Sequence, residues 1–176
     1  DEVETVLRDL KRLLDEHRRR SEELNKRSEE LLREHEERSK RLNERSEKLA
    51  RELREMKKRG EVDEETVKDL ARENEELLRR LDKHLEDLER ENKRLLRDLD
   101  RHLEELKKTV EDLKRRANVS EEFVKRMDEL LRKLEEDHRR SVRENEKLLE
   151  ELRRRHKKSV DDNRRLLEKL KRDADR

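Results

Sequence analysis

Histidine, serine and asparagine recur at a fixed interval along this chain, and these are the residues that could do chemistry. The stretch "HRRRSEELNKRSEELLRE" at residues 17–34 is followed by "HEERSKRLNERSEKLARE" at residues 35–52, so its polar positions return after 18 residues. The full set is His17, Ser21, Asn25, Ser28, His35, Ser39, Asn43, Ser46, Asn74, His84, Asn92, His102, His138, Ser141, Asn145, His156, Ser159 and Asn163. Neutral imidazole, hydroxyl and amide groups both donate and accept hydrogen bonds, so they can form closed networks without burying charge.

Catalytic and metal chemistry are less well supported by these residues. Serine and histidine occur together, but the sequence shows no orienting acid, oxyanion hole or cleft. Histidines 18 residues apart on one helix are separated by about 27 Å, whereas zinc needs three or four close ligands. The Glu-x-x-His motif of carboxylate bundles occurs once, at Glu135 and His138, with Glu135 outside the apolar stripe. We therefore expect no enzyme activity, cofactor or metal, and a metal- or haem-binding bundle stays an alternative.

Two short segments interrupt an otherwise helical pattern. In "KKRGEVDEET", Gly60 can adopt the left-handed conformation that ends a helix, and Asp63 can cap the next helix. In "RRANVSEEF", Asn118 can take the part of the glycine, and Ser120 can be the N-cap. These signals predict helices at about 2–59, 64–117 and 121–174. Short turns require neighbouring helices to run antiparallel.

Leucines and the recurring polar residues share one stripe on each predicted helix. At about 100° per residue, the stripe covers an arc of about 120°, which needs two partner helices to bury it. Eighteen residues make five turns, so the stripe should not drift around the helix and little supercoiling is needed. The sequence therefore predicts an all-α fold, a straight up-down-up three-helix bundle with an 18-residue repeat, and a single domain over residues 1–176.

The repeat also predicts which polar residues meet. Folding about the first turn places residues whose numbers sum to about 123 at one level, and the second turn does the same for sums of about 237. The expected neighbours are His102 with Ser21, Asn25 and His138, His84 with Ser39, Asn43 and His156, Asn92 with Asn145, and Asn74 with Asn163. For His17 and His35 the repeat predicts only the approximate level along the bundle, and no individual partners. Apolar residues such as Val3, Leu7, Leu10, Leu53, Val110 and Met127 stand one repeat away from polar positions and are expected to seal the ends.

The composition is far from that of an ordinary domain. Hydrophobic residues make up 27% of the 176 positions and charged residues 60%, a balance typical of disorder, yet the leucines keep helical spacing.

With 53 basic and 52 acidic residues mixed along the chain, no large electrostatic field forms to attract nucleic acid or anionic lipid. Cysteine is absent, and no apolar run could cross a bilayer. We expect a soluble protein that needs no partner and has no contact with membranes at neutral pH. A monomer is favoured, and a homo-oligomer is the alternative.

Four features of the sequence point to a known class of protein. They are the near-copied 18-residue units, the idealised caps, the absence of Pro, Cys, Trp and Tyr, and a composition dominated by Glu, Lys, Arg and Leu. Over its whole length the chain resembles de novo designed helical bundles with buried hydrogen-bond networks, including the pH-responsive kind that place histidine in those networks. The resemblance implies a synthetic scaffold without enzymatic activity or a natural host, which would be cytoplasmic in an expression host. It also implies that the polar layers supply pairing specificity.

Acid sensitivity is the functional expectation, and a static designed bundle without any pH function is its alternative. A histidine buried in neutral form has a pKa below its unfolded value of about 6.5, because burial disfavours the charged form. Stability is then lost as the pH falls below that value, because the unfolded chain binds more protons.

Overall fold

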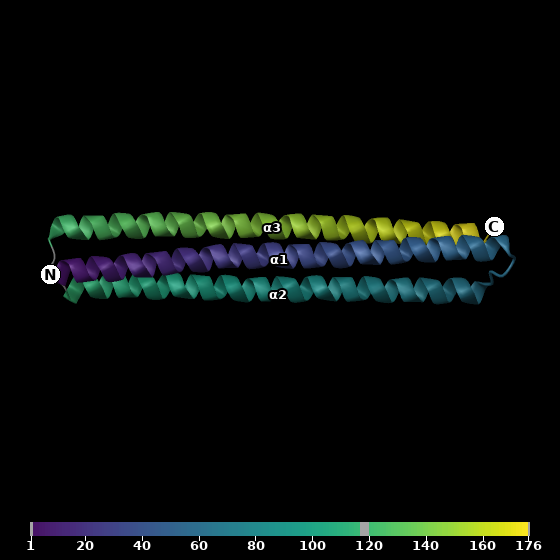
Figure 1. Ribbon diagram of the computed structural model, residues 1–176, viewed down its shortest axis with the longest axis horizontal. Coiled ribbons are helices and arrows are strands. Elements are labelled where there is room, and N and C mark those ends of the chain that lie inside the picture. The colour runs from purple at the N-terminus through teal and green to yellow at the C-terminus, as the bar shows by residue number, and fades with distance from the viewer. Residues whose placement is uncertain (1, 117–119, 176) are drawn as a thin grey trace. The chain divides into compact units, whose positions relative to one another are not determined.

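A computed structural model describes residues 2–116 and 120–175, and they form three long helices (Figure 1). Helix α1 spans Glu2–Lys58, α2 spans Glu64–Arg116 and α3 spans Glu121–Asp175. The predicted boundaries are therefore correct to within one residue wherever the chain is described. No strand occurs in the described ranges. None of the three helices contains a stretch apolar enough to span a membrane.

The cap residues explain where the helices begin and end. Gly60 has a φ of 69°, the left-handed conformation predicted for it, and its N–H donates to the carbonyl of Lys57. The carboxylate of Asp63 accepts hydrogen bonds from the backbone N–H and the hydroxyl of Thr66 at 2.7 Å each, which fixes the start of α2. The role predicted for Asn118 lies outside the described residues.

Ser120 caps α3, because its hydroxyl accepts a hydrogen bond from the Phe123 N–H at 3.3 Å. We expect Ser120→Ala to lower the free energy of unfolding by about 1 kcal/mol, since one backbone donor in the first turn then loses its partner. Ser120→Asp is the matched control and should retain nearly full stability, because a carboxylate can accept the same bond. Denaturant midpoints measure both effects, and equal losses in the two variants would contradict the capping role.

Contacts divide the chain into two units, each built from one segment of every helix. Unit 1 contains residues 1–29 and 90–148, and unit 2 contains residues 30–89 and 149–176. Within each unit the α2 segment runs antiparallel to the α1 segment, and the α3 segment runs parallel to it, as the cross-helix pairs below require. Each unit is thus an up-down-up three-helix bundle, which confirms the predicted all-α, three-helix architecture.

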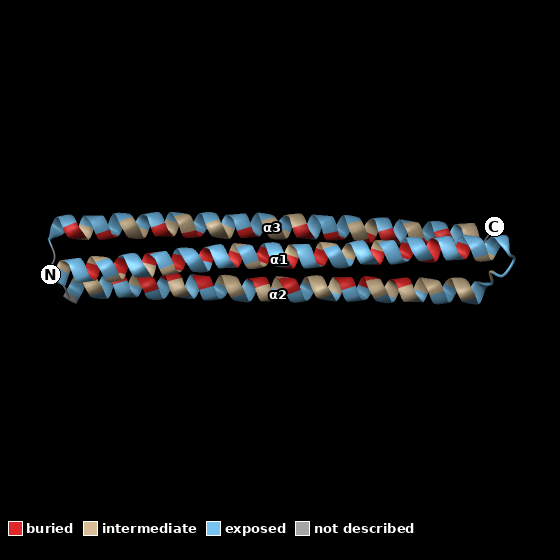
Figure 2. Ribbon diagram, viewed as in Figure 1, coloured by how far each residue is buried: buried red, intermediate tan, exposed pale blue. Residues whose placement is uncertain are grey.

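The apolar cores of the units sit on the faces that the three segments turn toward one another. Figure 2 shows that the buried positions recur along one side of α2 and of α3, with exposed positions on the other side. The main cluster of unit 1 contains Val6, Leu10, Leu14, Leu103, Leu106, Val110, Phe123, Met127 and Leu134. Unit 2 has three smaller clusters, centred on Leu78 and Leu81, on Leu88 and Leu152, and on Ala50 and Leu53. Leu10, Val110 and Met127, expected to seal an end of the core, are at most 1% exposed.

Candidate functional site: buried polar networks

A chain of three histidines and one aspartate crosses the core of unit 1. The central His17 is 1% exposed; its Nδ1 lies 2.9 Å from His102 Nδ1, and its Nε2 lies 3.1 Å from His138 Nδ1. The other ring nitrogen of His138, Nε2, lies 2.8 Å from a carboxylate oxygen of Asp100. The rings of His17 and His102 also stack, with centroids 5.1 Å apart and planes within 4° of parallel. One histidine from each helix therefore enters a single hydrogen-bonded chain.

Unit 2 contains the same chain displaced by one repeat. His35 is 1% exposed; its Nδ1 lies 3.0 Å from His84 Nδ1, and its Nε2 lies 2.8 Å from His156 Nδ1. Nε2 of His156 lies 2.7 Å from a carboxylate oxygen of Asp82. We call these two arrangements, Asp100–His138–His17–His102 and Asp82–His156–His35–His84, the histidine chains.

A second kind of network joins one serine and two asparagines, again once in each unit. In unit 1 the Ser28 hydroxyl donates to Asn92 Oδ1 at 2.8 Å, Asn92 Nδ2 donates to Asn145 Oδ1 at 2.8 Å, and Asn145 Nδ2 donates to Ser28 Oγ at 2.6 Å. These three bonds close a ring. The equivalent ring of unit 2 consists of Ser46, Asn74 and Asn163, with each bond 2.6 Å long. We call both the serine–asparagine rings.

The remaining three polar positions differ between the units. In unit 2, Ser39 and Ser159 are joined by their hydroxyls, and Asn43 Nδ2 donates to Ser159 Oγ at 3.1 Å. In unit 1 the corresponding residues, Ser21, Asn25 and Ser141, are not joined to one another by any hydrogen bond that the structure describes. The side-chain oxygen of Asn25 is buried without a partner among the described residues. The repeat in sequence is therefore not matched by a repeat in bonding at these positions.

The register between α1 and α2 differs from the predicted one by about one helical turn. The pairs His17–His102 and His35–His84 have numbers that sum to 119, and the serine–asparagine pairs sum to 120, in place of about 123. Residues 59–63 between the two helices are not helical, so they need not advance by the 1.5 Å per residue of a helix, and their path sets how far back along α1 the helix α2 begins. Consequently the α2 histidines, His102 and His84, contact His17 and His35 of α1. They do not contact the serines and asparagines that were predicted as their neighbours. The predicted facing pairs Asn92–Asn145 and Asn74–Asn163 do form.

Asp82 and Asp100 are the residues that sequence reasoning missed. Both stand two positions before a histidine, in the near-copied segments "LDKHLEDL" and "LDRHLEEL", one repeat apart. That signal is weak in a chain with 52 acidic residues. The side chains of Asp100 and Asp82 are 64% and 49% exposed, so they form the outer ends of the histidine chains. An orienting acid for histidine is therefore present, contrary to the expectation from sequence.

Burial lowers the pKa of four histidines. The pKa of His17 falls from 6.5 to about 4, first through desolvation and then through the charges of His138, His102 and Arg20, against a smaller opposing effect of Asp100. The pKa of His35 falls to about 4 for the same reasons, with His156, His84, Arg38 and Asp82 in the corresponding roles. Desolvation also lowers the pKa of the half-buried His84 and His102. Burial thus favours the neutral imidazole form of these four histidines in the folded protein.

The geometry does not favour metal binding or acyl transfer. His17 and His35 use their two nitrogens to contact two different rings, so the nitrogens do not converge on a common point. No group of three or more histidines, cysteines or carboxylates that could hold a metal ion occurs in the described part of the chain. Nor does any serine hydroxyl there donate to a histidine ring, which a serine nucleophile requires.

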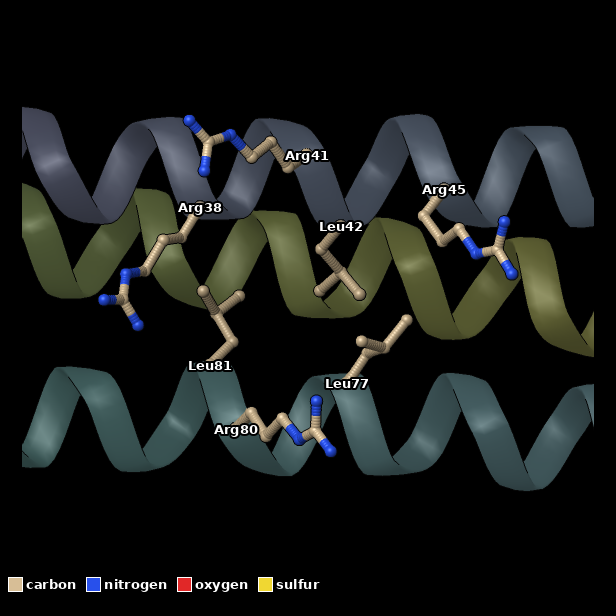
Figure 3. Close-up of a pocket in the computed structure, with 7 residues that line it drawn as sticks. All are labelled: Arg38, Arg41, Leu42, Arg45, Leu77, Arg80 and Leu81. Atoms are coloured by element: carbon tan, nitrogen blue, oxygen red, sulfur yellow. The ribbon is translucent and has the colours of Figure 1, made fainter.

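Two surface grooves, one in each unit, are lined by leucines and charged residues. A groove in unit 2 with a volume of about 490 Å³ is lined by Leu42, Leu77, Leu81 and four arginines (Figure 3). The guanidinium groups point in different directions, and those of Arg41, Arg45 and Arg80 each pair with a glutamate 2.9 Å away. The groove one repeat away in unit 1 carries Glu23 and Asp98 in place of two of the arginines. Neither groove gathers charges around a common centre.

Apolar and polar layers should respond differently to substitution. We expect Leu10→Asn to destabilise the protein more than Ser28→Leu, although the two sites are one repeat apart on α1. The asparagine would lie unpaired at a position that is 1% exposed among leucines, a loss of about 1–3 kcal/mol in addition to the lost apolar contacts. Ser28→Leu adds apolar area and disturbs one serine–asparagine ring. Urea midpoints of both variants provide the measurement, and equal shifts would contradict the layered arrangement.

Fold and site together define the class of protein: a three-helix bundle with buried hydrogen-bond networks of histidine, asparagine and serine. No known protein family and no curated protein matches the sequence. Among solved structures, a chain described as a computationally designed three helix bundle matches with 15% sequence identity and a TM-score of 0.36, over 99% of this chain and 81% of that one. A likeness of this size supports no inference about function.

Proposed function

We propose that this chain is a designed, non-enzymatic scaffold whose buried histidine chains make its stability depend on pH. The observation that carries the proposal is the placement of His17 and His35, which are almost fully buried and hydrogen-bonded through both ring nitrogens. A second proton on either ring would bring a positive charge into the core, where burial disfavours the charged form. The near-copied repeats and idealised caps support the designed origin.

The pH dependence can be tested by comparing the parent with a variant in which all six histidines are changed to asparagine. Denaturant unfolding of both proteins at pH 7.4 and pH 5 gives the two losses of stability. The parent is expected to lose more, because its unfolded state gains protons that the buried His17 and His35 do not take up in the folded state. Equal losses would leave a static scaffold, the alternative function, in which the networks serve pairing specificity alone.

We further propose that the protein is a monomer that requires no partner, nucleic acid or membrane at neutral pH. Each unit already contains three helical segments that bury one another's apolar stripes, and the described residues include no exposed large hydrophobic side chain. Light scattering at pH 7.4 should therefore give a mass close to 21.9 kDa. A repeat at pH 4.5 tests the state and the acid response together, and a multiple of the monomer mass at neutral pH would establish the homo-oligomer.

A further inference from the structure

Each histidine chain ends on a group that can only accept a hydrogen bond. Ionised Asp100 has no proton to donate, so the nitrogen that faces it, His138 Nε2 at 2.8 Å, must carry hydrogen. In a neutral ring the other nitrogen is then a lone pair, so His138 Nδ1 accepts. His17 Nε2, 3.1 Å away, must therefore be the donor.

The same reasoning fixes the donors and acceptors up to the far end of the histidine chain. Because neutral His17 carries its proton on Nε2, its Nδ1 accepts, and His102 Nδ1 at 2.9 Å must donate to it. The lone pair left over is on His102 Nε2, at the half-exposed end. In unit 2, Asp82 sets His156, His35 and His84 in the corresponding order.

We propose that Asp100 and Asp82 are positioning residues that orient their whole histidine chains, so that all hydrogen bonds run toward the carboxylate and the first added proton enters at His102 or His84. This inference rests on the proposed function and names how the same site is regulated. One proton can bind to His102 Nε2 and leave all three hydrogen bonds of the chain in place. A second, on His17 Nδ1 or His138 Nδ1, must break one of them.

The charged groups around the entry points fit this assignment. His102 lies near Glu16 and Arg20 of α1 and Glu105 of its own helix. The two glutamates favour a positive charge on the His102 ring, and Arg20 opposes it. His84 likewise has Glu34 and Arg38 of α1 and Asp87 of α2 nearby. The central His17 is flanked by two other histidines and Arg20, and Asp100 is the acid that acts on it. His35 has the same surroundings in His156, His84, Arg38 and Asp82.

Nitrogen NMR of the imidazole rings tests the orientation directly, because protonated and unprotonated ring nitrogens give well-separated signals. At pH 7.4 we expect His102 and His84 to carry hydrogen on Nδ1, and the other four histidines on Nε2. Asp100→Ala should shift the His102 signals toward an average of the two tautomers. The signals of His84, whose chain ends on Asp82, should remain unchanged in this variant and provide an internal control.

Two further variants separate a positioning role from a merely structural one. Asp98→Ala removes an exposed carboxylate two residues away and should leave every ring signal in place. Asp100→Asn keeps a carbonyl oxygen that can accept the bond and should restore most of the parental His102 pattern. A parent with hydrogen on His102 Nε2, or an Asp100→Ala spectrum identical to that of Asp98→Ala, would overturn the inference. These measurements at neutral pH are independent of the acid-unfolding comparison, so either proposal can fail without the other.

Discussion

The free energy of unfolding is expected to fall by several kcal/mol as the pH drops from 6.5 to about 4, chiefly through His17 and His35. Both have a folded pKa of about 4 against an ordinary value of 6.5, so in this interval the unfolded chain binds protons that the folded chain does not. Stability is complete above pH 6.5 and the loss ends near pH 4. At about 1.4 kcal/mol for each pKa unit, each residue contributes roughly 3 kcal/mol.

Such a loss is large beside the roughly 5–15 kcal/mol that stabilises a typical domain. Urea unfolding at half-unit steps of pH measures it, and the double variant His17→Asn with His35→Asn should remove most of it. The matched control is His84→Asn with His102→Asn, which changes two histidines that are only half-buried and should remove a smaller part. An unchanged pH profile in the His17 and His35 double variant would contradict this account.

A single substitution in a serine–asparagine ring should cost more than replacing the whole ring. Asn145 is fully buried and takes part in hydrogen bonds to both Ser28 and Asn92. Asn145→Leu leaves the Asn92 amide N–H without its acceptor and the Ser28 oxygen without its donor, and we expect a loss of about 3 kcal/mol in the free energy of unfolding. The triple variant Ser28→Ala, Asn92→Leu and Asn145→Leu removes every member and should recover most of that loss, because no buried polar group is left unpaired.

The chain offers a matched control for this comparison. Asn25 is a half-buried asparagine whose side-chain oxygen has no partner among the described residues, so Asn25→Leu should be neutral or stabilising. Chemical denaturation of the three variants and the parent gives the result. If Asn25→Leu costs as much as Asn145→Leu, the closed ring contributes nothing beyond the effect of inserting a leucine.

Local signals in the sequence were sufficient for the helices and their faces. Gly60, Asp63 and Ser120 act within a few residues of the boundaries they set, so their roles could be predicted without knowledge of the partner helices. The 18-residue recurrence placed histidine, asparagine and serine on the apolar stripe, and the facing pair Asn92–Asn145 followed from the length of the second turn. The fold class and most of the buried polar residues could therefore be predicted from the sequence.

What the tertiary structure alone decided is the identity of the bonded partners. The non-helical connection at residues 59–63 sets the register of α2 along α1, which differs from the predicted register by about one turn and brings His17 against His102 in place of Ser21. The same packing selects Asp100 and Asp82, because among the described residues these are the carboxylates hydrogen-bonded to a buried histidine of α3, at 2.8 and 2.7 Å. It also leaves the side-chain oxygen of Asn25 without a partner among the described residues, although the side chain of Asn43 is bonded to Ser159. A hydrogen bond depends on distances of a few tenths of an ångström, and the periodicity of a sequence specifies only which side of a helix a residue occupies.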